Sequence, residues 1–117
     1  MPEGALNLIK IEHWGSWGFS GIALEAISHI DKYFGPGKFA YHIYNDHHKT
    51  GRLEFTLYPN SLKEIEDQGI LIHSKKLTGK FVSDDLTGFL AKISDAIQLK
   101  HACWQTLHFR NKNASYL

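Results

Sequence analysis

The sequence predicts a single α/β domain, spanning residues 1–117, in which a mixed four-stranded sheet packs against two main helices in the order β-α-β-β-β-α. Three observations predict this class. Four short segments have the apolar pattern of strands, two longer segments carry apolar residues at helical spacing, and clusters of Gly, Pro and polar residues separate them. A chain of 117 residues is also long enough to bury one hydrophobic core without disulfides.

The first strand is predicted over residues 6–13, where Leu8 points to one face and Ile9 and Ile11 to the other. Apolar side chains on both faces are typical of a central strand that is covered on both sides. After a glycine-rich turn, apolar residues recur at i, i+3, i+4 and i+7 and predict a helix over residues 19–34. Gly35-Pro36-Gly37 ends this helix. Its predicted buried face comprises Phe19, Ile22, Ala23, Ala26, Ile27, Ile30, Tyr33 and Phe34.

Two further strands follow, over residues 39–44 and 53–58, with a polar loop between them and Pro59 at the end of the second. The strand at 39–44 is parallel to the first strand if the helix is a crossover. Ser61 and Glu64 have the spacing of a capping box and predict one short helical turn in the connection over residues 60–69.

Residues 70–74 predict the fourth strand, which is followed by a basic pair and Gly79. Ser83 is the predicted N-cap of the last helix, and Asp84 and Asp85 complement the dipole of its first turn. Residues 101–117 form a possible extra tail that prolongs this helix and then frays. The predicted buried face of the last helix comprises Leu86, Phe89, Leu90, Ile93, Ala96, Ile97 and Lys100.

Composition limits the classes of function. The formal net charge is +1, from 13 basic and 12 acidic residues, which provides no field to attract nucleic acid or a membrane surface. Cys103 is the only cysteine, so an intramolecular disulfide is excluded. No apolar run is long enough to span a membrane, and the N-terminus lacks a signal-peptide pattern. We therefore expect a cytoplasmic protein with no cofactor, no nucleic-acid partner and no membrane association.

The turn from Glu12 to Phe19 is the candidate functional site. A glycine-rich turn between a strand and a helix places helix N–H groups where a reactive thiol or an anion commonly binds. Here the two positions spaced like a redox pair are Trp14 and Trp17.

Two motifs carry a family resemblance. Leu71-Ile72-His73-Ser74-Lys75-Lys76, followed by Gly79, Phe81-Val82 and an amphipathic helix, resembles the fourth-strand signature of the selenoprotein W family, also called Rdx proteins. Trp14-Gly15-Ser16-Trp17-Gly18-Phe19 resembles the family motif Cys-Gly-x-Cys-Gly-Tyr/Phe, in which selenocysteine can replace the second cysteine. The resemblance covers roughly residues 6–100 and implies a thioredoxin-like fold.

The chain departs from the family where chemistry would occur. An indole can neither form a mixed disulfide nor exchange electrons with a thiol, so Trp14 and Trp17 as written are inert and favour a non-catalytic binding or regulatory module. The two indoles then form an aromatic plug, and the turn from Trp14 to Phe19 is the expected contact with another protein. Two further departures are a longer connection around residues 60–68 and the tail beyond Lys100.

An alternative follows from the codon UGA, which encodes selenocysteine in some genes and tryptophan in some genetic codes. If positions 14 and 17 are really Cys or selenocysteine, the resemblance implies a thiol or selenol oxidoreductase with an antioxidant role linked to glutathione or thioredoxin.

Three other groups of residues have side chains of the types that bind metals or anions or that react. His42, Asp46, His47 and His48 are of the type that binds zinc or copper, but adjacent histidines in a polar loop are more often solvated, and no metal site is expected. Lys75, Lys76 and Lys80 are interpreted as a solvated basic loop rather than a nucleic-acid site. Cys103 is interpreted as an idle thiol.

Overall fold

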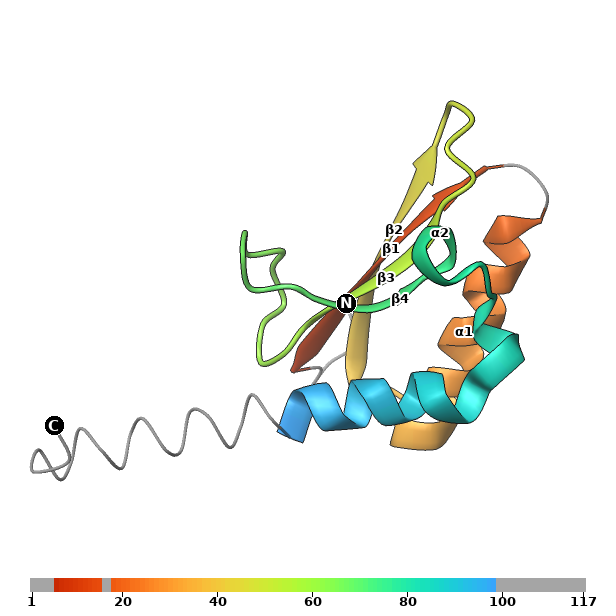
Figure 1. The fold of residues 1–117 in the computed structure, drawn as a ribbon. Helices are drawn as coiled ribbons and strands as arrows, with labels where there is room; N and C mark the ends of the chain where they lie inside the picture. Colours follow the sequence, from red (N-terminus) through yellow and green to blue (C-terminus); the bar gives the residue numbers. More distant parts are fainter. Residues whose placement is uncertain (1–5, 16–17, 99–117) are drawn as a thin grey trace, which may run out of the picture.

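The sheet contains four strands in the order β2-β1-β3-β4, with β1 at Asn7–Trp14, β2 at Phe39–Asp46, β3 at Leu53–Tyr58 and β4 at Ile70–Ser74 (Figure 1). The structure is a computed structural model that describes residues 6–15 and 18–98. β1 pairs in parallel with β2 and antiparallel with β3, and β3 pairs antiparallel with β4. The predicted α/β class and the mixed four-stranded sheet are therefore confirmed, as is the central position of β1.

Two long helices cover one face of this sheet. Helix α1, at Phe19–Phe34, connects β1 to β2, and a second helix occupies residues 86–98 after β4. Both lie on the same side of the strands in Figure 1, and both contribute to one hydrophobic cluster with that face. Two short elements were not predicted, the one-turn helix α2 at Lys75–Thr78 and the 3₁₀ turn η1 at Val82–Asp85.

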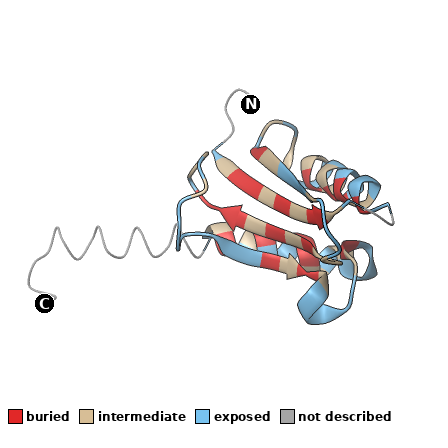
Figure 2. Cartoon of the chain, turned by 90° about the horizontal axis from the view of Figure 1, so that it is seen from above, coloured by how far each residue is buried: buried red, intermediate tan, exposed pale blue. Residues whose placement is uncertain are grey.

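The main core lies between the sheet and the two helices. Ile11 stands opposite Phe55 in the β1–β3 register, and both side chains are fully buried. Figure 2 shows buried residues recurring along the strands, as the alternation in the sequence predicts. On α1, Phe19, Ala23, Ala26 and Ile30 are buried, and Ile22, Ile27 and Phe34 pack against the core.

Tyr33 is an exception to the predicted face of α1. Its side chain is 62% exposed because it lies at the margin of the apolar stripe, where its ring packs edge-on against Phe34 at 4.8 Å.

The other face of the sheet is only partly covered, so the prediction of a β1 strand buried on both sides is wrong in part. Leu8 is buried in a small second cluster with Ala40 and Tyr58, against which Leu62 packs. Further along β1, the same face presents Lys10 and Glu12, which form an ion pair at 3.5 Å. These charged groups remain partly exposed because a charge without water or full pairing is costly to bury.

The predicted helical turn over residues 60–69 is wrong. Ser61 Oγ accepts a hydrogen bond from the N–H of Lys63 at 3.0 Å, one residue short of the capping-box spacing. Asn60 and Asp67 have φ angles of 55° and 66°, which a right-handed helix does not contain. Glu64 instead reaches the polar sheet face, where it bonds with His42 at 2.7 Å and with Tyr44. Burial raises the pKa of Glu64, but hydrogen bonds from Tyr44 and His42 outweigh it, and the pKa lies below its usual value.

The helix over residues 86–98 begins differently from the prediction. Asp85, rather than Ser83, directly precedes the helix and accepts a hydrogen bond from the N–H of Gly88 at 3.1 Å. Asp84 belongs to η1, where it accepts a hydrogen bond from the N–H of Phe81 at 2.8 Å. The predicted buried face is confirmed for Phe89, Leu90, Ile93 and Ala96, while Leu86 and Ile97 are partly buried. Lys100, Cys103 and the possible tail 101–117 lie outside the described residues.

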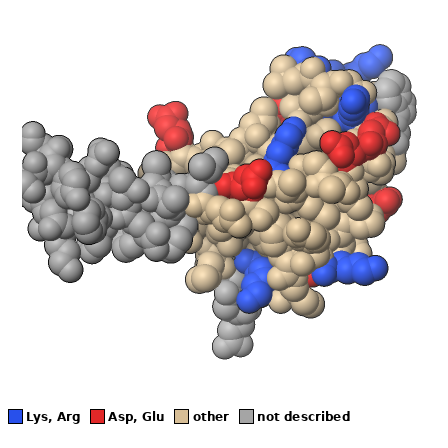
Figure 3. Space-filling view, turned by 60° about the horizontal axis from the view of Figure 1, so that its bottom comes forward, with Lys and Arg blue, Asp and Glu red and all other residues tan. Residues whose placement is uncertain are grey.

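Charged side chains of both signs are interspersed on the face that Figure 3 displays. Among residues 6–15 and 18–98, no helix has the length and apolar character needed to cross a membrane.

Candidate functional site

The candidate turn connects the end of β1 to the start of α1. Trp14 is the last residue of β1, Gly18 is the N-cap of α1, and Phe19 is its first residue. Gly18 has a φ of 73°, in the left-handed region where glycine is favoured. Ser16 and Trp17 lie outside the described residues, so Trp14 is the member of the predicted pair whose place the structure gives.

The end of β1 is held by backbone hydrogen bonds from two sides. The N–H of Trp14 donates to the carbonyl of Arg52 at 2.9 Å, and the N–H of Gly15 donates to the carbonyl of Asp46 at 3.3 Å. A Cβ on Gly15 would lie 2.3 Å from Oδ1 of Asn45, so the absence of a side chain permits this close approach to the end of β2. The first residues of the turn are therefore fixed by the sheet.

A compact ion-pair group supports these contacts, and we call it the Arg52 cluster: Arg52, Asp46, Glu12 and Glu54. Nε of Arg52 lies 2.7 Å from Oδ2 of Asp46 and its NH2 group lies 2.9 Å from Oδ1, which makes a bidentate pair. The same guanidinium lies 3.1 Å from Glu12 and 3.5 Å from Glu54. Arg52 thus contacts three carboxylates beside the turn, one of which, Glu12, also pairs with Lys10.

The cluster changes the acidity of its members. The hydrogen bond from Arg52 lowers the pKa of Asp46 to about 2, with a further contribution from Thr50, whose hydroxyl donates at 2.7 Å. The hydrogen bond to Asp46 raises the pKa of Arg52 above its usual value. Sequence reasoning did not find this cluster, because its members come from three strands and the loop between two of them.

The four candidate metal ligands are not brought together. His42 bonds with Glu64 on the polar sheet face, Asp46 is engaged by Arg52, and His47 and His48 are exposed in the loop after β2. Within the part of the chain that the structure describes, no group of three or more His, Cys, Asp or Glu side chains could hold a metal ion.

An aromatic row continues from the turn into the fold. The rings of Trp14 and Phe19 meet edge-on at 6.3 Å, and those of Phe19 and Phe81 at 5.9 Å. The ammonium of Lys75 lies 5.9 Å from the centre of the Phe19 ring and 5.1 Å from that of Phe81. Trp14 is half-buried and also packs against the main core. These groups offer packing and cation–π contacts, which stabilise structure and interfaces.

His13 lies beneath the turn. It is 3% exposed, and its Nδ1 donates to the carbonyl of Trp14 at 3.0 Å. This bond requires a proton on Nδ1 and ties the histidine to the backbone of the turn.

No family model, curated protein or solved structure matches the chain.

The pH dependence of stability tests the Arg52 cluster. Because the pKa of Asp46 is about 2 in the folded state and 3.8 as the reference for the unfolded state, its contribution is present above pH 3.8 and is lost as the pH falls towards 2. After a discount for solvent screening, we expect this contribution to be about 1 kcal/mol. Urea unfolding between pH 6 and pH 2 measures it, with Asp46→Asn as the control. Parallel losses of stability in the wild type and Asp46→Asn would contradict the prediction.

Proposed function

We propose that the chain is a selenoprotein W-like domain of thioredoxin-like fold that acts as a non-catalytic binding or regulatory module. The motifs at Trp14–Phe19 and Leu71–Lys76 support the family assignment. The mixed sheet, with α1 as the crossover between the parallel strands β1 and β2, is compatible with the fold. The observation that carries the proposal is the packing of Trp14, since the residue at the first redox position has an indole packed against Phe19 and the core.

The proposed contact surface is the turn from Trp14 to Phe19, and the proposed partner is another protein. Gly15 and Gly18 are exposed, and the Arg52 cluster holds the start of the turn against the sheet. The start of the turn, at Trp14 and Gly15, is already held in place and so loses little conformational entropy on binding. Aromatic side chains are enriched at the energetic centres of interfaces. A cytoplasmic location agrees with the single cysteine of the chain.

Two measurements on the purified chain test this function. We expect no turnover in a disulfide reduction assay driven by glutathione or by thioredoxin with its reductase, because an indole cannot form the mixed disulfide. We also expect a protein captured by the wild type to be lost with Trp17→Ala and retained with Tyr33→Ala, which removes an exposed aromatic ring from α1. Turnover by the wild type, or capture that survives Trp17→Ala, would count against the proposal.

The alternative is an oxidoreductase in which positions 14 and 17 are Cys or selenocysteine. One observation favours it: position 14 lies at the end of β1, shortly before the N-terminus of the 16-residue helix α1. The ammonium of Lys75 also lies close to the ring of Phe19, the first residue of this helix. A helix N-terminus and a nearby cation both lower the pKa of a thiol. The intact mass of the protein from its native source decides between the two, since two genuine tryptophans would exclude this alternative.

A further inference from the structure

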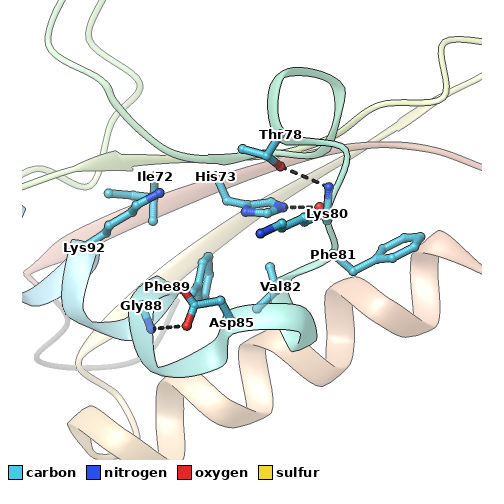
Figure 4. A pocket seen from close by; sticks show the side chains of 10 residues that line it. All are labelled: Ile72, His73, Thr78, Lys80, Phe81, Val82, Asp85, Gly88, Phe89 and Lys92. Carbon is cyan, nitrogen blue, oxygen red and sulfur yellow. Dashed lines mark hydrogen bonds between the residues drawn. The ribbon is translucent and has the colours of Figure 1, made fainter.

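A cavity of about 280 Å³ lies on the same side of the sheet as the helices, between β4, the loop after α2 and the start of the helix over residues 86–98 (Figure 4). It does not include the residues of the candidate turn. Its apolar lining comes from Ile72, Phe81, Val82 and Phe89, and its polar lining from His73, Thr78, Lys80, Asp85 and Lys92.

The apolar wall is part of the packed core. Phe89 is 3% exposed, and its ring lies edge-on to Phe55 at 5.1 Å and to His73 at 6.2 Å. Val82 is also 3% exposed. The wall is therefore preformed, as ligand sites usually are.

Two lysines supply the charge of the cavity. Figure 4 shows the side chains of Lys80 and Lys92 on opposite sides of the cavity, with that of Lys80 extending toward its middle and that of Lys92 ending beside Ile72. Neither ammonium is within ion-pair distance of a carboxylate among the residues that the structure describes. Two cations without carboxylate partners on either side of a cavity favour an anion between them.

The loop that carries Lys80 is held by hydrogen bonds. His73 Nε2 donates to the carbonyl of Lys80 at 2.8 Å, and the N–H of Lys80 donates to Oγ1 of Thr78 at 3.1 Å. Burial lowers the pKa of His73 and the charge of Lys92 lowers it too, while the hydrogen bond to Lys80 and the charge of Asp84 act in the opposite direction; the net effect is a pKa below the usual value of histidine. Asp85 accepts a hydrogen bond from Gly88 at 3.1 Å and so stabilises the start of the helix. At neutral pH the charged residues of the lining are two lysines and one aspartate, so the lining has a net positive charge.

We propose that this cavity binds a small organic anion, with its carboxylate or phosphate between Lys80 and Lys92 and an apolar group against Phe89 and Val82. The volume lies just below the usual range for drug-sized ligands and suits a molecule with about one ring. This site shares no residue with the turn, although its Phe81 packs against Phe19. The variants that test it, at Lys80 and Lys92, leave the turn unchanged, so either proposal can fail without the other.

Titration of the full chain with phenyl phosphate, followed by the backbone amide NMR signals of Val82, Asp85, Gly88 and Lys92, tests the proposal. We expect saturable shifts at these residues. Inorganic phosphate tests the contribution of the apolar group, and benzyl alcohol tests that of the charge. Both are expected to bind at least about tenfold more weakly, because each lacks one of the two recognition elements.

Matched variants locate the site. Lys80→Gln and Lys92→Gln are each expected to weaken phenyl phosphate binding about tenfold, the size of one charge-assisted contact. Lys76→Gln makes the same charge change on the exposed part of α2 and is expected to leave the affinity unchanged. Asp85→Asn is expected to strengthen binding a few-fold, because it removes a negative charge from the lining. All three lysines are exposed, so the far-UV circular dichroism of each lysine variant should match the wild type.

The proposal is overturned if phenyl phosphate produces no saturable shift, or if benzyl alcohol or inorganic phosphate binds as tightly. It is also overturned if Lys76→Gln weakens binding as much as Lys80→Gln and Lys92→Gln, since binding would then depend on overall charge.

Discussion

Replacing Phe55 with alanine is expected to lower the free energy of unfolding by about 3–5 kcal/mol, the usual cost of removing a fully buried phenyl ring. Phe55 is 0% exposed at the middle of β3, and it stands opposite Ile11 of β1 and His73 of β4. Its ring also lies 5.1 Å from that of Phe89 on the last helix. The substitution leaves a cavity at the point where the two central strands and this helix meet. Urea unfolding at neutral pH, followed by circular dichroism, measures the loss.

Tyr33→Ala is the control, because it removes an aromatic ring of similar size that is 62% exposed on α1. We expect it to cost less than about 1 kcal/mol. Phe55→Leu should lie between the two variants, because it keeps part of the buried volume. Equal losses for Phe55→Ala and Tyr33→Ala would show that the core is not placed as described.

The second large effect is expected from Arg52→Gln, which should lower the free energy of unfolding by about 2 kcal/mol. The substitution leaves Asp46, Glu12 and Glu54 close together without the guanidinium that now lies 2.7–3.5 Å from them. The side chain of Arg52 is 32% exposed, so the cost should fall between those of a surface pair and a buried pair. Chemical unfolding at pH 7 in low salt measures it, and high salt should reduce the difference.

Lys10→Gln is the matched control, since Lys10 also pairs with two carboxylates on the same sheet face, Glu12 at 3.5 Å and Glu64 at 3.9 Å. We expect it to cost less than about 1 kcal/mol, because these contacts are longer and neither is bidentate. A double-mutant cycle of Arg52→Gln with Asp46→Asn isolates the bidentate pair. A coupling energy near zero, or equal costs for the two single variants, would contradict the role given to Arg52.

The elements that face the main core could be predicted from the sequence because their side chains follow a simple period. Four strands and α1 lie within one or two residues of the predicted bounds, since strand alternation and helical spacing report which face each residue buries. The buried face of the last helix, from Phe89 to Ala96, followed from the same rule.

The remaining features depend on contacts between distant parts of the chain. Ser61 and Glu64 have the local spacing of a helix cap, but Glu64 bonds with His42 and Tyr44 about twenty residues away. Ser74, predicted only as a strand residue, also caps α2 by accepting a hydrogen bond from the N–H of Leu77 at 3.3 Å. Local patterns compete with such long-range partners, and the sequence alone does not rank them.

The position of the candidate turn could be predicted from the sequence, but the ion pairs of Arg52 that lie beside it could not. Trp14 lies at the end of β1 because the apolar alternation ends there. The contact of Arg52 with Asp46 and Glu12 requires the register of β1 against both neighbours, which follows from the folded sheet. The cavity beside Lys80 and Lys92 likewise requires the relative placement of β4 and the last helix.

The central position of β1 also affects how the described fold unfolds. The segment from β1 to β2 and the segment from β3 to the last helix are consecutive halves of the chain, and the sheet joins them through the β1–β3 pairing. Each half supplies a pair of strands and one long helix to a shared core, so neither can keep its apolar surface from water when the other unfolds. The free energy of the β1–β3 pairing is therefore common to both halves, and we expect the described fold to unfold as a single cooperative unit despite its two-part construction.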